Sequence, residues 1–306
     1  MKAAIRIGVA AATLAFVAWR VGTGPFVDGL RTIDVGALAA AAVLGALTTV
    51  GCAWRWRIVA RGLGVDLPLG TAVAAYYRSI FLNLALPGGV VGDVHRGIGY
   101  GLRPVAWERT AGQVVQVVVT VAVLLVAPSP VHAAMPVVVL GLFALAATVA
   151  LAMRVRPSAG RSRWARLSGA VASDVRTGLL ARRAWPAIAV ASAFVVAGHT
   201  ATFLIAARTV GVTAPVGEMV PLALLVLAGA ALPNVGGWGP REGVTAWAFA
   251  AAGLGARHGV AAAVAYGVLV LVASLPGAAV LLAAWVRRIA SARWPALTRG
   301  QVLRDV

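Results

Sequence analysis

Long runs of apolar residues dominate the chain. Runs long enough to cross a bilayer as a helix, about 17–25 residues, fall at 4–21, 36–54, 105–128, 131–153, 184–206 and 258–286. These runs are continuous, whereas the strands of a membrane β-barrel are short and alternate apolar with polar residues. The pattern therefore predicts an all-α polytopic membrane protein with about six full transmembrane helices.

Two further apolar stretches, 70–103 and 215–255, are interrupted in the middle. Proline, glycine and charged residues gather there, near Leu86–Arg96 in the first stretch and near Leu232–Glu242 in the second. Proline ends a helix and glycine permits tight turns, so each stretch is expected to form two short helices joined by a break.

The positions of the arginines predict the topology. Segment 154–183 carries eight arginines and one acid, Asp174, so the positive-inside rule places it in the cytoplasm. The same rule places both chain ends and the cluster of Arg55, Arg57 and Arg61 there. The predicted organisation is a single transmembrane domain over 1–306, with a first half at about 1–153, a cytoplasmic basic loop at 154–183, a second half at about 184–290 and a cytoplasmic tail at 291–306.

Counting crossings between these cytoplasmic points constrains the interrupted stretches. Two uninterrupted spans already return the chain to the same side in each half, so 70–103 and 215–255 must each enter and leave from one side. They do so from opposite faces, which predicts two re-entrant helical hairpins in an inverted repeat, a pattern that points to a transporter's substrate site. Pairs of short full spans or ordinary kinked helices are the alternative.

Composition agrees with a membrane protein. The 306 residues are 61% hydrophobic and 12% charged, against about a quarter charged in soluble domains. A net charge of +18 does not indicate nucleic acid, because the arginines lie in short segments between apolar runs. The single cysteine, Cys52, excludes a disulfide framework, and residues 1–21 are expected to be a retained span because they lack a small-x-small cleavage pattern.

The first interruption combines turn residues with a charged pair. Asp93 is expected in the first turn of the second short helix, where a carboxylate is favoured, and Arg96 lies three residues later on the same face. The turn residues and the preceding polar side chain are Asn83, Pro87, Gly88, Gly89 and Gly92.

The second interruption repeats this order. Arg241 and Glu242 follow Pro240 at the predicted helix start, and because they are adjacent we expect them to point to different partners. Trp238 lies inside the turn and is a candidate cavity-lining residue. The other residues of the interruption are Pro233, Asn234, Gly236, Gly237 and Gly239.

Charges at membrane depth are costly and usually functional. A helix N-terminus beside an arginine suits an anion, so Arg96 and Arg241 are candidate head-group ligands, with Asp93 and Glu242 neutralising them or binding a cation or proton. The alternative is that the four charges pair across the two halves and hold them together.

Other polar residues have more than one interpretation. Glu108, followed by Arg109, is a proton carrier, a partner for Arg96 or a plain helix-start residue. His199 is more typical of an interhelical hydrogen bond than of a proton relay. The histidine spacing shows no metal site, and no cofactor motif is present. Five tryptophans are interpreted as interface residues: Trp54, Trp56, Trp185, Trp285 and Trp294.

At these residues the chain resembles the lysylphosphatidylglycerol synthase transmembrane-region, or flippase-like, family. The resemblance covers about 5–290 and rests on Asn83, Leu86-Pro87-Gly88, Gly92-Asp93 and Arg96, and on Leu232-Pro233, Gly236-Gly237, Gly239 and Arg241-Glu242, with counterparts at Glu108-Arg109 and Trp54-Arg55. It implies two inverted re-entrant elements and lipid translocation. The C-terminal soluble synthase of two-domain members is missing, so we expect no aminoacylation activity and a different cargo.

The expected function is therefore that of a flippase-like transporter, not an enzyme, moving an anionic phospholipid or a polyprenyl-phosphate-linked lipid across the cytoplasmic membrane. Its expected partners are membrane lipids, a separate lipid-modifying enzyme or a second copy of the chain. One alternative is a membrane-embedded lipid-linked glycosyltransferase using Asp28 or Asp34 as a base. The other is a regulatory partner of a lipid synthase that docks through segment 154–183.

Overall fold

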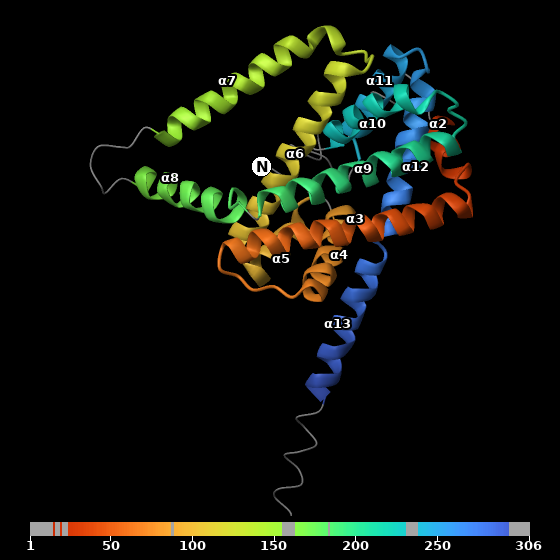
Figure 1. The fold of residues 1–306 in the computed structure, drawn as a ribbon. Coiled ribbons are helices and arrows are strands. Elements are labelled where there is room, and N and C mark those ends of the chain that lie inside the picture. The colour runs from red at the N-terminus through yellow and green to blue at the C-terminus, as the bar shows by residue number, and fades with distance from the viewer. Residues whose placement is uncertain are drawn as a thin grey trace, which may run out of the picture.

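The computed structural model describes residues 24–86, 89–154, 163–182, 184–230 and 238–293, together with Ala15 and Trp19. These residues fold into an all-α membrane protein (Figure 1). The described helices are α2 (Gly24–Arg31), α3 (Val35–Gly62), α4 (Leu69–Ala85), α5 (Val91–Tyr100), α6 (Leu102–Val126), α7 (Met135–Arg154), α8 (Arg163–Asp174), α9 (Trp185–Thr209), α10 (Val216–Ala230), α11 (Pro240–Ala251), α12 (Ala256–Ser274) and α13 (Pro276–Arg293).

Within the described part of the chain, four helical stretches are long and apolar enough to cross a membrane: Val35–Gly62, Leu102–Val126, Trp185–Thr209 and Ala256–Arg287. They correspond to four of the predicted spans. The predicted span 131–153 corresponds to α7, which has 20 residues. The predicted span 4–21 lies outside the described residues apart from Ala15 and Trp19, so the count of about six full spans stays a prediction.

Two boundaries differ from the sequence prediction. Helix α3 continues to Gly62, eight residues beyond the predicted end at 54, because Trp56, Val59 and Ala60 remain buried in its last turns. The predicted span 258–286 is two helices, because Pro276 begins a new helix directly after α12 ends at Ser274. A proline has no N–H to continue the helical ladder.

Both interrupted stretches form pairs of short helices, as the sequence predicts. Helices α4 and α5 have 17 and 10 residues, and α10 and α11 have 15 and 12. Each pair is packed helix against helix. In the first pair, a Cβ on Gly92 would lie 2.0 Å from the Ser79 carbonyl oxygen, so only glycine allows this approach of α5 to α4.

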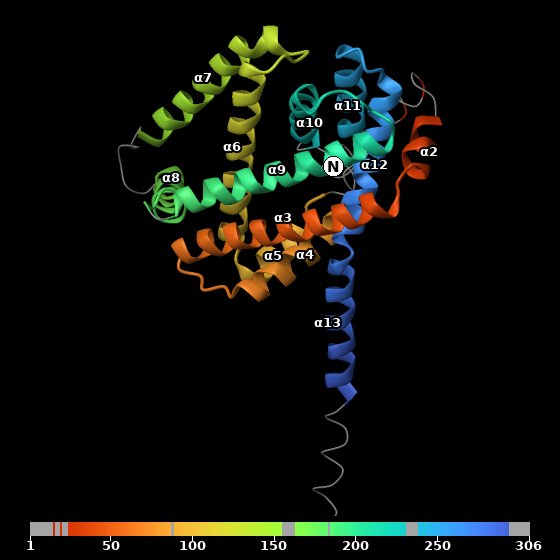
Figure 2. The ribbon, with the colours of Figure 1, turned by 45° about the vertical axis from the view of Figure 1, so that its right-hand side comes forward.

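Helices α3 and α9 run antiparallel, side by side, through the centre of the molecule (Figures 1 and 2). In both views α4 and α5 lie on one side of this central pair, and α10 and α11 lie on the other. Helix α12 packs against both α3 and α9, and α6 against α9, so the centre of the bundle is built from both halves of the chain.

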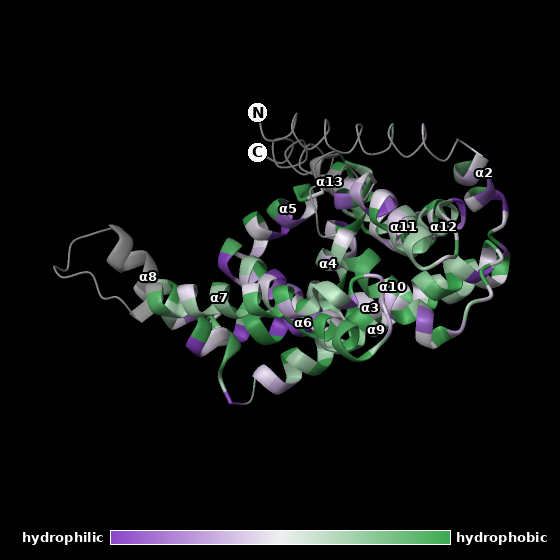
Figure 3. Cartoon of the chain, turned by 90° about the horizontal axis from the view of Figure 1, so that it is seen from above, coloured by the Kyte–Doolittle hydropathy of each residue, from purple (hydrophilic) through white to green (hydrophobic). Residues whose placement is uncertain are grey.

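Hydrophobic residues predominate along most of the helices (Figure 3), and many large apolar side chains are exposed. Val137, Leu140 and Phe143 on α7 are exposed, as are Leu282 and Trp285 on α13. In water such a surface would be unfavourable, whereas against lipid tails it costs nothing. The exposed apolar faces and the long apolar helices together define a multi-pass membrane protein.

Candidate functional site

A buried charge network joins α3, α5 and α6. The Glu108 carboxylate is fully buried, and its Oε1 accepts hydrogen bonds from Arg55 Nε at 3.0 Å and from the Tyr76 hydroxyl at 3.2 Å. Its Oε2 accepts from Arg96 Nη2 at 3.1 Å. Glu108 is therefore a partner for Arg96, one of the roles that the sequence left open.

Asp93 forms the second acidic centre of the network. It lies in the first turn of α5, as predicted, and accepts from Arg96 Nη2 at 3.0 Å, as the three-residue spacing indicates. Ser79 and Arg109 also donate to it. Asn83 donates to Asp93 at 3.1 Å and accepts from the Gly92 backbone N–H at 2.7 Å, so it ties the end of α4 to the start of α5.

Arg96 lies inside an aromatic cage. Its guanidinium carbon is 4.5 Å from the centroid of the Trp56 ring and 4.2 Å from that of the Tyr76 ring, distances typical of cation–π contacts. The side chain is completely buried, yet its Nε and Nη1 have no hydrogen-bond partner. Buried Arg109 Nε and Trp56 Nε1 also lack partners. The network thus retains several unused donors.

The second half holds a similar arginine. The Arg241 guanidinium lies 5.4 Å from the ring centroids of Trp238 and Tyr266, and Arg241 pairs with Glu242, which is fully buried. The expectation that these adjacent residues have separate partners is wrong. Glu242 Oε2 turns back to accept from the Gly239 N–H at 2.7 Å, and this capping bond leaves Oε1 facing Arg241.

Two glycines make room for the arginine side chains. A Cβ on Gly112 would lie 2.8 Å from Arg55 Nη2, and a Cβ on Gly267 would lie 2.6 Å from Arg241 Nη2. Gly239 precedes α11 with a φ of 115°, a conformation that favours glycine. Small residues therefore shape both charged sites.

The charges pair within each half of the described chain, not across the two halves. Arg55, Arg96 and Arg109 bind acids of the first half, and Arg241 binds Glu242 of the second. A polar bond does join the halves, since Arg55 donates to Ser192 at 3.1 Å. The Tyr266 hydroxyl lies 3.2 Å from His199 Nδ1. The second contact links α12 to α9 within the second half, and it is the interhelical bond expected of His199.

A cavity of about 280 Å³ opens beside the network. Its charged lining residues are Arg55 and Arg109. The Arg109 side chain is 42% exposed, whereas Arg96 is fully buried and is not part of the lining. The polar lining is completed by Cys52, Tyr76, Asn83, Gln113, Gln116, Ser192 and His199.

The other predicted site residues are distributed as follows. Asn83 and Gly89 line the cavity, while Trp238 lies against Arg241 and packs beside Val260 and Val264. Gly92 and Gly239 occupy the helix starts described above. Six residues fall outside the described part of the chain: Pro87, Gly88, Pro233, Asn234, Gly236 and Gly237.

Sequence reasoning missed four residues of the network, namely Arg55, Trp56, Tyr76 and Ser79. Arg55 was assigned to a cytoplasmic arginine cluster and Trp56 to the membrane interface, but both side chains are buried. Trp54, Trp185 and Trp285 are exposed, as interface residues would be. The one sequence signal for an inward-pointing Arg55 is the acid Glu108, which needs a basic partner when it is buried.

Asp34 and Asp28, the candidate bases of the glycosyltransferase alternative, both accept local hydrogen bonds within the fold. Asp34 caps α3, where its Oδ1 accepts from the Ala37 N–H at 2.7 Å. Asp28 lies on α2 and its carbonyl accepts from Thr32. Among the described residues, no group of three or more histidine, cysteine or acidic side chains could hold a metal ion.

The polar segment after α7 is fixed to the membrane helices by Asp174. Its carboxylate accepts from Arg103 and from Trp107 Nε1, the latter at 2.9 Å. The hydrogen bond from Arg103 lowers the pKa of Asp174 below its usual value. Trp107 directly precedes Glu108, so this attachment adjoins the buried network.

These observations define a multi-pass α-helical membrane protein with a buried arginine–carboxylate network. The chain matches the family described as the lysylphosphatidylglycerol synthase TM region over residues 3–277, and it belongs to that family. No curated protein and no solved structure matches the chain. The family indicates a function connected with membrane lipids.

Proposed function

We propose that the protein is a flippase-like transporter that moves an anionic phospholipid or a polyprenyl-phosphate-linked lipid across the cell membrane. The observation that carries this proposal is the surplus of positive charge beside the cavity. Three arginines, Arg55, Arg96 and Arg109, face two carboxylates, Asp93 and Glu108, so one positive charge is left without a counter-charge.

A buried charge needs a partner because desolvation costs several kcal/mol per ion. The unused hydrogen-bonding groups in the network are donors: Arg96 Nε and Nη1, Arg109 Nε and Trp56 Nε1. An anion in the cavity supplies the missing negative charge and an acceptor for Arg109, which lines the cavity. A phosphate-containing head group in the cavity would contact Arg109 and Arg55, with Arg96 supplying positive charge from behind the lining.

The arrangement of the helices supports alternating access. A long helix, two short helices and another long helix occur in this order in both halves, as α3 to α6 and as α9 to α12. The two short pairs lie on opposite sides of the central helices (Figure 2). We therefore infer an inverted repeat with two re-entrant hairpins, cytoplasmic termini and transport in place of catalysis.

The rate at which labelled lipids cross the bilayer of liposomes that contain the purified protein tests the proposal. We expect labelled phosphatidylglycerol to cross faster than labelled phosphatidylcholine. In an Arg109→Gln variant the transport rate of phosphatidylglycerol should fall at least about tenfold, because raising the free-energy barrier to transport by about 1.4 kcal/mol slows the rate tenfold. Arg61→Gln removes an exposed arginine and should leave the rate unchanged.

Folding of both variants is checked by thermal unfolding in detergent. An Arg109→Gln variant that folds and moves phosphatidylglycerol at the wild-type rate would remove the cavity from the mechanism. Equal rates for the two lipids with the wild-type protein would remove the preference for an anionic head group.

A further inference from the structure

We infer that His199 takes up a proton when an anionic head group binds in the cavity, so that the lipid and the proton move together. This inference rests on the proposed function and adds a coupling ion to it. It starts from the place of one titratable side chain that the charge network does not use.

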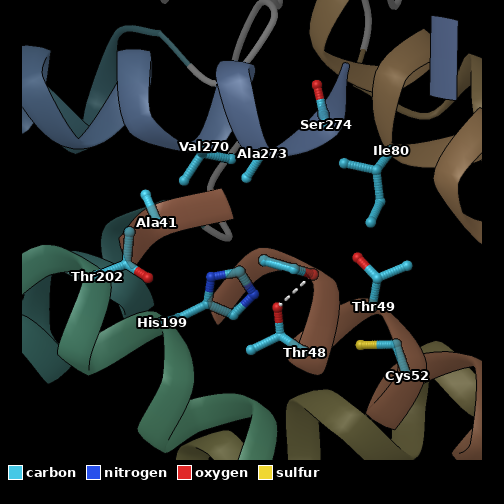
Figure 4. A pocket seen from close by; sticks show the side chains of 11 residues that line it. Ala41, Thr48, Thr49, Cys52, Ile80, His199, Thr202, Val270, Ala273 and Ser274 are labelled. Carbon is cyan, nitrogen blue, oxygen red and sulfur yellow. Dashed lines mark hydrogen bonds between the residues drawn. The ribbon is translucent and has the colours of Figure 1, made fainter. Parts of the chain in front are cut away.

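His199 lies where two cavities meet. It lines the charged cavity beside Arg55 and Arg109, and it also lines a neighbouring cavity of about 50 Å³ (Figure 4). The imidazole is only partly buried. Cys52, Ile80 and Val270 are lining residues common to both cavities, so the two spaces adjoin along one wall.

The smaller cavity is suited to water. Three hydroxyl groups on its wall give their hydrogens to backbone carbonyls: Thr48 to Gly45, Thr202 to Gly198 and Ser274 to Leu271. Their oxygen lone pairs stay available as acceptors. Although much of its wall is apolar, a cavity of this size with several hydroxyl groups can hold one or a few water molecules, and these could bring a proton to the imidazole.

Titratable or charged groups surround His199 from each neighbouring helix. Those that face it are Cys52 and Arg55 from α3, Tyr76 from α4, Arg109 from α6 and Tyr266 from α12. The charged members of this set are both arginines. Tyr266 bonds to Nδ1, and a tyrosine oxygen can accept as well as donate, so this bond persists when both ring nitrogens carry protons.

Coulombic linkage follows from these charges. In the empty site, a proton on His199 would add a positive charge to a network that already has one in excess. A bound phosphodiester cancels that excess and so makes protonation of the imidazole more favourable. Because linkage is reciprocal, a protonated His199 increases the affinity for the anion by the same factor.

The proton taken up by His199 determines the net charge of the loaded site. A water molecule in the small cavity delivers a proton from solvent to the ring nitrogen that Tyr266 does not hold, forming an imidazolium. The loaded site, with one anion and one added proton, then has the same net charge as the empty site. Transport of the anionic lipid would therefore move no net charge across the membrane.

The affinity of the purified protein for short-chain phosphatidylglycerol, measured between about pH 5 and 8, tests the inference. This lipid keeps a single negative charge over that range. With wild-type protein we expect the affinity to rise as the pH falls, by up to about tenfold per pH unit for one linked proton. The His199→Gln variant should bind with an affinity that is independent of pH and equal to the wild-type value at the upper end.

Two variants separate titration from other roles of histidine. Tyr266→Phe removes the hydrogen bond but keeps the imidazole, so the pH dependence should persist. His258→Gln changes an exposed histidine at the start of α12 and should also keep it. A pH-independent affinity in the wild type, or a pH-dependent affinity in His199→Gln, would overturn the inference.

Proton uptake by the wild-type protein provides a measurement that needs no variant. Adding phosphatidylglycerol in weak buffer with a pH-sensitive dye should remove up to one proton from solution per lipid bound. Binding without proton uptake would overturn the coupling and leave the proposed function intact. Failure to bind either phosphatidylglycerol or a polyprenyl phosphate at any pH would overturn both.

Discussion

At the scale of residues, each half buries an arginine in a similar way. Each places an arginine between a tryptophan and a tyrosine ring and pairs it with a buried acid: Arg96 with Glu108, and Arg241 with Glu242. The aromatic faces and the carboxylate together replace the water that a guanidinium loses on burial. The first site differs because two further arginines share its acids.

Glu108 is the residue on which this network depends most. Replacing it with Gln removes the charge that faces both Arg55 and Arg96, and breaking a buried ion pair in this way typically costs about 3–5 kcal/mol. We expect that loss in the free energy of unfolding, measured by denaturant titration in detergent micelles. Glu218→Gln, which changes an exposed glutamate, should have almost no effect. Equal stability of the two variants would contradict the structural role of Glu108.

The sequence predicted only part of this residue-scale picture. Spacing was sufficient for Asp93 and Arg96, because residues three apart share a helix face. Spacing was misleading for Arg241 and Glu242, because a capping bond turned the glutamate back toward its neighbour. Arg55 and Trp56 were assigned to the surface because an arginine beside two tryptophans near a helix end is also typical of a membrane interface. Only the tertiary contact with Glu108 separates these cases.

At the scale of elements, the two broken stretches were predictable because proline and glycine have local effects. The break after Ala85 and the helix starts at Val91 and Pro240 follow from residues that end or begin helices in any context. The packing of α5 on α4 was not predictable, because it depends on a backbone contact between Gly92 and Ser79. That contact requires the three-dimensional path of both helices.

The close contact within the first hairpin can be tested with two glycines on one helix. Gly92→Ala places a methyl group against the Ser79 carbonyl, so α4 and α5 must separate at a cost of about 1–3 kcal/mol. Gly99→Ala adds the same methyl group where no atom lies within 4 Å, and alanine favours the helix by up to about 1 kcal/mol. Thermal unfolding should therefore shift down for the first variant and stay level or rise for the second. Identical melting temperatures would contradict this packing.

At the scale of the whole molecule, the surplus positive charge lies beside a cavity between the two halves, whose central helices α3 and α9 are antiparallel. The charged cavity is walled by helices of both halves, with Asn83 and Arg109 from the first and Ser192 and His199 from the second. Movement of one half against the other would therefore change the walls of the cavity. If the halves form the proposed inverted repeat, a site between them can be reached first from one face of the membrane and then from the other, as the proposed lipid translocation requires.

The proposed inverted repeat predicts the side of the membrane from which each proposed hairpin enters. In a Cys52→Ala background, single cysteines are placed at exposed positions just outside each hairpin: Asp66→Cys and Leu102→Cys for the first, Thr213→Cys and Ala252→Cys for the second. We expect an impermeant thiol reagent to label the first two from the cytoplasmic side only and the last two from the external side only. Both ends of a re-entrant hairpin lie on one face, whereas a helix that crosses once has its ends on opposite faces. Labelling of Asp66→Cys and Leu102→Cys from opposite sides would therefore replace the re-entrant hairpin by a single crossing, and the positive-inside count for segment 154–183 would then have to be wrong as well.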